Sequence, residues 1–135
     1  MNWQGEARSN YFQVKDSEKF KAAMRSIGVT VEEGDGKNAG KFAVFAADGE
    51  GWPSSVIDEE INDVVEVDVV DTVVEHLASG SVAVFMQVGH EGSRYVNADA
   101  VAIDSTGERV EIGLDEIYDR AKTKFPNREV TRASH

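Results

Sequence analysis

The chain has 135 residues and a formal net charge of −11 at pH 7, with 41% hydrophobic and 29% charged residues. This size and composition are typical of one globular domain, and they exclude a disordered or collagen-like chain. The sequence contains no cysteine, which excludes disulfide frameworks, zinc–cysteine sites, iron–sulfur clusters and thiol nucleophiles.

The N-terminal part is predicted to form a strand followed by a helix. The segment Ser9–Lys15 has two aromatic residues at its centre, as strands often do. A helix is expected next, because Asp16 can cap its N-terminus and Gly28 can supply the left-handed residue after its end. Between them, apolar residues recur at helical spacing and predict a stripe that faces the core: Phe20, Ala23, Met24 and Ile27.

Two further strands, Val29–Glu33 and Lys41–Asp48, are predicted on either side of a glycine-rich hairpin connection. Both faces of the second strand are largely apolar, so we expect it to lie inside the sheet. The glycines, proline and serines of Gly49–Ser55 cannot continue a central strand and predict a loop. Trp52 in this loop is expected to pack against the core rather than to form an exposed contact.

The acidic segment from residue 56 to residue 80 is compatible with two structures. The valines at 65, 67 and 69 alternate with acidic residues as in an edge strand, whereas the valines from 69 onward recur at helical spacing. We predict a helix over about Val69–Ala78, with Asp68 as its N-cap. Whether residues 64–69 form strand or helix stays open at this point.

Three neighbouring antiparallel strands are predicted next, at Ser81–His90, Ser93–Asp104 and Glu108–Gly113. Short turns join them at Glu91–Gly92 and at Asp104–Gly107, each with glycine where a positive φ is needed.

A last helix is predicted after Gly113 and ends at Pro126, with acidic residues in its first turn, where the helix dipole favours them. Its apolar stripe consists of Leu114, Ile117, Tyr118, Ala121 and Phe125. The order of elements predicts an α+β fold, a mainly antiparallel sheet of about six strands with about three helices packed on one face. Residues 1–126 are expected to form this single domain, and residues 127–135 a flexible tail.

The net charge is concentrated in the middle of the chain. No Lys or Arg occurs between Lys41 and Arg94, and this 52-residue interval holds 11 acidic residues, while the rest of the chain has 14 acidic and 14 basic residues. Direct nucleic-acid binding is not expected, because affinity for phosphates comes from Lys and Arg that displace counterions. A basic protein surface is the expected partner, and the alternative is an acidic surface that serves only solubility.

Eight acidic residues of this interval form the candidate partner-binding site: Asp58, Glu59, Glu60, Asp63, Glu66, Asp68, Asp71 and Glu75. On the predicted helix, Asp68, Asp71 and Glu75 lie on one face with carboxylates about 5–6 Å apart, a spacing comparable with the phosphate repeat along one nucleic-acid strand. Like charges at this spacing destabilise a helix. No lysine of the segment offsets this cost, so the arrangement favours a function, namely that of a DNA mimic.

Other chemistry is not supported by the sequence. Asp58, Glu60 and Asn62 lack the glycine of a calcium-binding loop, and His76 and His90 are not part of a zinc motif. No GxSxG motif or phosphate-binding glycine loop is present. We therefore expect a protein that is not an enzyme and that holds no metal and no cofactor.

The segments RSNYFQVKD, SVAVFMQVGHEGSRYVNADAVAID and LDEIYDRA resemble small uncharacterised proteins of bacterial plasmids and phages. The size, the acidity and the lack of catalytic motifs also resemble phage and plasmid inhibitors of host defence, the anti-restriction and anti-CRISPR proteins, several of which mimic DNA charge. These resemblances imply a binding function but no particular functional residue.

The sequence thus favours a non-enzymatic inhibitor that binds a basic, nucleic-acid-binding surface of a bacterial defence complex, either a CRISPR effector or a restriction enzyme. One alternative is an immunity or antitoxin protein that masks a basic nuclease toxin. Another is a small hydrolase or ligand-binding domain with a pocket near Trp52 and His90. No apolar stretch approaches about 18 residues and no signal peptide is recognisable, so we expect a cytoplasmic protein of a bacterial host with no membrane partner.

Overall fold

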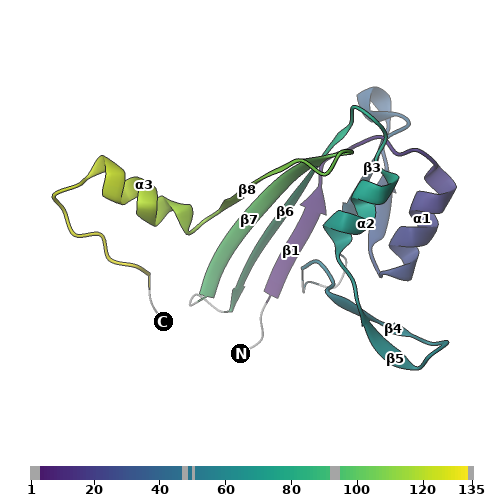
Figure 1. The fold of residues 1–135 in the computed structure, drawn as a ribbon, viewed down its shortest axis with the longest axis horizontal. Coiled ribbons are helices and arrows are strands. Elements are labelled where there is room, and N and C mark those ends of the chain that lie inside the picture. Colours follow the sequence, from purple (N-terminus) through teal and green to yellow (C-terminus); the bar gives the residue numbers. More distant parts are fainter. Residues whose placement is uncertain (1–3, 47–48, 50, 92–94, 134–135) are drawn as a thin grey trace.

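The computed structural model of the chain describes residues 4–46, 49, 51–91 and 95–133. Its main element is an antiparallel sheet of six strands in the order β2-β3-β1-β6-β7-β8 (Figure 1). These strands are β1 (Gln4–Ser9), β2 (Thr30–Glu33), β3 (Phe42–Phe45), β6 (Val82–Glu91), β7 (Tyr95–Asp104) and β8 (Arg109–Gly113). A second sheet is the hairpin of β4 (Ser55–Asp58) and β5 (Asp63–Glu66). With its three helices, the chain has the α+β fold that the sequence predicts.

Helices α1 (Ser17–Ser26) and α2 (Val69–His76) begin at the predicted capping residues. A carboxylate oxygen of Asp16 accepts hydrogen bonds from the first-turn amides of α1 at 3.0 and 3.1 Å, and one of Asp68 accepts from the amide of Asp71 at 2.9 Å. After α1, Gly28 adopts φ of +77°, the left-handed conformation expected of it. A short 3₁₀ turn, η1 (Gly36–Asn38), lies in the glycine-rich connection between β2 and β3.

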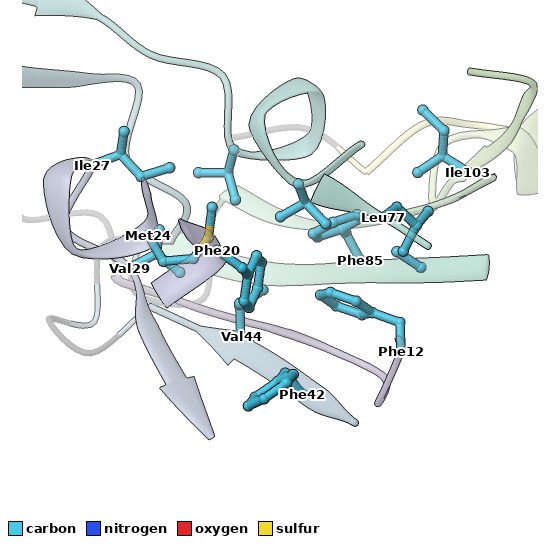
Figure 2. Packing of buried hydrophobic residues seen from close by; sticks show 13 residues of the cluster. Phe12, Phe20, Met24, Ile27, Val29, Phe42, Val44, Leu77, Phe85 and Ile103 are labelled. Atoms are coloured by element: carbon cyan, nitrogen blue, oxygen red, sulfur yellow. The ribbon is translucent and has the colours of Figure 1, made fainter. Parts of the chain in front are cut away.

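The core lies between the sheet and helices α1 and α2 (Figure 2). Phe20 of α1 is fully buried and meets Phe12 edge-on at 5.7 Å and Phe42 at 5.9 Å between ring centroids. Trp52 is half-buried and packs edge-on against Phe85 at 5.7 Å, which confirms that its side chain packs against the core. The α1–α2 layer is therefore fixed to the sheet by aromatic contacts.

The first strand lies earlier in the chain than predicted. The sequence places it at Ser9–Lys15, whereas β1 covers Gln4–Ser9 and lies between β3 and β6. The residues of β1 on the side of the helices are Gly5, Ala7 and Ser9, which are all buried and small, so the strand carries no hydrophobic pattern. The aromatic segment that suggested the strand instead forms isolated bridges and sends Phe12 into the core.

The acidic segment contains both structures that its valines allowed, one after the other. Residues 63–66 form β5, and the helix begins at Val69 as predicted and ends at His76, two residues earlier than expected. The β4–β5 hairpin was not predicted. The third strand was expected to reach Asp48 and a turn was expected at Glu91–Gly92; residues 47–48 and 92 lie outside the described residues.

Helix α3 (Glu116–Lys124) differs from the other two in its position. Helices α1 and α2 cover one face of the sheet, as predicted, but α3 continues beyond the end of β8 and away from that layer (Figure 1). Following residues turn back along α3, where the Arg132 guanidinium lies 4.2 Å from the centroid of the Tyr118 ring and 3.8 Å from the Asp115 carboxylate. The opposite face of the sheet is therefore left open.

Candidate binding surfaces

The eight predicted acidic residues lie on two neighbouring elements, the β4–β5 hairpin and helix α2. We call this set the acidic surface, and it comprises Asp58, Glu59, Glu60, Asp63, Glu66, Asp68, Asp71 and Glu75. The hairpin extends from the body of the protein below α2 (Figure 1). Seven of the eight residues are exposed, and Asp58 is half-buried. None of the eight forms an ion pair with another described residue.

The hairpin places like charges against each other. Asp58 and Asp63 are direct cross-strand partners at the end of the β4–β5 ladder. Each carboxylate accepts a local backbone hydrogen bond, Asp58 from the amide of Glu60 at 3.0 Å and Asp63 from the amide of Val64 at 2.8 Å. Like charges directly opposite in a sheet are destabilising. The hairpin tip is thus electrostatically unfavourable for the isolated protein.

Of the three carboxylates predicted on one face of α2, one accepts a backbone hydrogen bond at the start of the helix and two are exposed without such a role. Asp68 caps the helix, while Asp71 and Glu75 are exposed. The ammonium of Lys15, from a distant part of the sequence, donates to the backbone carbonyl of Glu75 at 3.4 Å, near the C-terminal end of the helix. Tertiary structure therefore brings one positive charge to this end of the acidic surface.

The hairpin also presents apolar side chains to solvent. Ile57 is 71% exposed and lies opposite Val64, which is 61% exposed, on the face of the hairpin that does not carry Asp58 and Asp63. Ile61 in the connecting turn is 64% exposed. The sequence analysis missed these residues, although three large apolar residues within an acidic segment could have been noticed. An apolar cluster surrounded by charge is typical of a protein contact site.

A second candidate surface is the sheet face opposite α1 and α2. Over β1, β2 and β3 it is polar: the Tyr11 hydroxyl donates to the Glu32 carboxylate at 2.9 Å, and this hydrogen bond raises the pKa of Tyr11. The guanidinium of Arg8 lies 3.6 Å from the same carboxylate. Over β6, β7 and β8 the face is apolar and contains a shallow groove of about 480 Å³, which extends from Met86 past Ile112 to Leu114, Ile117 and Arg120 at the start of α3.

Neither a metal site nor a membrane span is found in the described part of the chain. No cluster of His, Asp and Glu side chains there is suited to hold a metal ion. No described helix is both long and apolar enough to cross a bilayer. His76 packs against Phe20 with ring centroids 6.2 Å apart, and neither His90 nor Trp52 lines the groove on the open sheet face.

Comparison with known proteins gives no relative for this chain: no protein-family model, no curated protein and no solved structure matches it.

Proposed function

We propose that the protein is a non-enzymatic inhibitor whose acidic surface occupies a basic, nucleic-acid-binding surface of a bacterial defence complex. The observation that carries this proposal is the acidic surface itself, eight carboxylates on a hairpin and a helix with no ion-pair partner among the described residues. The like-charge pair of Asp58 and Asp63 costs stability, and a basic partner would remove that cost. The choice of a defence complex, a CRISPR effector or a restriction enzyme, rests on the resemblance to phage and plasmid inhibitors.

Charge and apolar contacts have separate roles in this proposal. The single-sign surface attracts a basic groove over long range and accelerates encounter, an effect that salt screens within about 8 Å at physiological ionic strength. Ile57, Ile61 and Val64 then supply the desolvated contacts that slow dissociation. A nucleic acid is repelled by the same surface, so the protein competes with nucleic acid and does not bind it.

The test measures DNA binding by a purified CRISPR effector complex and by a purified restriction enzyme, with labelled duplex and fluorescence anisotropy. Stoichiometric protein should reduce DNA binding by at least one of them. The double variant Asp71→Asn/Glu75→Gln should lose most of this inhibition, because each charge-assisted contact contributes about 1.5–3 kcal/mol. Asp68 is left unchanged so that the N-cap of α2 is the same in the variant and in the unmodified protein.

The matched control is the double variant Asp99→Asn/Glu108→Gln, which removes the same two charges at exposed positions outside the acidic surface. It should inhibit as well as the unmodified protein. Equal inhibition by both double variants would assign the acidic surface to solubility alone, and submicromolar binding of the free protein to DNA or RNA in a mobility-shift assay would contradict the proposal.

A further inference from the structure

The open sheet face is apolar over three adjacent strands. The sheet face below α1 and α2 is buried, whereas the large side chains of the open face are 49–66% exposed. These exposed residues are Val82, Met86, Val88, Val96, Val110 and Ile112. Between the rows on β6 and β8, β7 presents Ala98, Ala100 and Ala102, with Ala100 paired to both Met86 and Ile112, while Val96 of β7 lies beyond the end of β8. The face is therefore a shallow trough with a low floor and larger side chains along its two sides.

Helix α3 has an apolar stripe that is equally uncovered. Leu114, Ile117 and Phe125 are 43–57% exposed, and no residue of α3 is buried. Among the described residues, no helix or strand packs extensively against α3. Only Leu114 and Asp115 connect β8 to α3, and the helix extends past the sheet rather than across it (Figure 1). The start of α3 borders the trough through Leu114, Ile117 and Arg120, but the rest of the helix extends beyond the sheet and leaves the trough open.

We propose that a second copy of this chain covers the open sheet face, with α3 of each copy lying in the trough of the other. Helix α3 and the floor of the trough have similar lengths. Helix α3 has nine residues, which gives a length of about 14 Å. The alanine row from Ala98 to Ala102 spans four residue steps of a strand, also about 14 Å.

The apolar area available is what a stable dimer requires. The six side chains of the sheet face and the three of α3 are on average about half exposed. With roughly 100 Å² of apolar surface for a large aliphatic side chain, the nine residues offer each copy on the order of 450 Å². A standard interface buries about 800 Å² per partner, of which somewhat more than half is apolar. A two-fold exchange uses both surfaces of both copies, so the apolar side chains of the sheet face and of α3 are covered together.

Charge favours the same arrangement. The second half of α3 and the residues after it, from Arg120 to Arg132, have five Lys or Arg residues and one acidic residue, whereas Asp115, Glu116 and Asp119 lie at the start of the helix. The segment from Leu114 to Arg132 thus has five basic and four acidic residues, and the remainder of the chain has nine basic and 21 acidic residues. Two such acidic bodies repel each other, but the basic end of this segment, placed on the other copy, reduces the repulsion. The acidic surface lies at the other end of the molecule from α3, so dimerisation leaves it free and does not depend on the proposed function (Figure 1).

Sedimentation velocity over a range of protein concentrations tests the dimer. The full chain should sediment with twice the mass of one 14.7 kDa chain. Ile112→Glu should raise the dissociation constant about 100-fold or more, because it places a carboxylate in the apolar trough that the helix of the other copy covers. Ile57→Glu is the matched control, since Ile57 is more exposed than Ile112 but lies on the hairpin; it should leave the dimer unchanged. Circular dichroism verifies that each variant is folded.

A variant of the helix tests which surfaces meet. Phe125→Glu should weaken the dimer as Ile112→Glu does. A mixture of the two variants should recover partial dimerisation, because the intact helix of one chain can pair with the intact sheet face of the other. A monomeric full chain at all concentrations would overturn the proposal, as would loss of the dimer with Ile57→Glu. Dissociation by Ile112→Glu but not by Phe125→Glu would show that the sheets pack against each other, and would also overturn it.

Discussion

Replacement of Phe20 by alanine should remove a large part of the stability of this protein. The side chain is fully buried and contacts three rings, those of Phe12, Phe42 and His76, with centroid distances of 5.7, 5.9 and 6.2 Å. A buried Phe→Ala change costs about 3–5 kcal/mol, and loss of the edge-on ring contacts places Phe20 in the upper part of that range. Total stability is of the order of 5–15 kcal/mol, so Phe20→Ala should lower the Tm by roughly 12–20 °C.

The measurement is urea unfolding followed by circular dichroism, together with a thermal melt. Ile57→Ala is the control, because Ile57 is 71% exposed and its truncation should change the free energy of unfolding by less than about 0.5 kcal/mol. The ring of Phe20 links α1 to His76 at the end of α2, so its loss should also loosen the helix that carries Asp71 and Glu75. A cost below about 1 kcal/mol for Phe20→Ala would show that the core is not assembled around this ring.

Three further predictions concern local structure. Asp68→Ala should lower stability by about 1 kcal/mol in urea unfolding because α2 loses its N-cap, whereas Asp68→Asn should be nearly neutral because asparagine caps as well. The Thr106 hydroxyl and neighbouring backbone amides donate to Asp104 and lower the pKa of its carboxyl group. Because the charged form is favoured in the folded state, Asp104→Asn should be less stable than the unmodified protein at neutral pH. This difference in stability should disappear as the pH falls through the lowered pKa of Asp104. Equal stabilities at neutral pH would contradict the prediction. Gly51 has φ of +84° and a Cβ there would press on the Gln87 side chain, so Gly51→Ala should cost about 1–2 kcal/mol, measured as a shift in the urea midpoint.

Local sequence determined the elements whose signals lie within a few residues. Asp16 and Asp68 mark the starts of α1 and α2 because a carboxylate there accepts first-turn amide hydrogens, an interaction that needs no distant partner. The turn at Asp104–Gly107 is local in the same way: the carboxylate of Asp104 accepts the amide of Thr106, and Gly107 adopts a positive φ. The concentration of acidic residues between Lys41 and Arg94 is also visible in the sequence, because charge is independent of the fold.

Long-range pairing decided what the local pattern could not. Strand β1 has almost no hydrophobic signal, and it forms because both of its edges are occupied, with Arg8 paired to Phe45 on one side and to Met86 on the other. The β4–β5 hairpin forms in spite of the repulsion between Asp58 and Asp63. Its half-buried Val56 packs against the main core, a contact that residue spacing alone does not indicate.

Helix α3 shows most clearly which properties follow from the sequence alone and which depend on the tertiary structure. The stripe of Leu114, Ile117 and Phe125 shows from sequence alone that the helix is amphipathic, because helical periodicity depends only on spacing. Periodicity does not specify which surface meets the stripe. That depends on the direction in which the chain leaves β8, and the two-residue connection directs α3 past the sheet, so that only its first residues border the sheet face that the chain leaves open. Which apolar surfaces are covered is thus a property of the tertiary structure, since it follows from where the elements lie and not from what they contain.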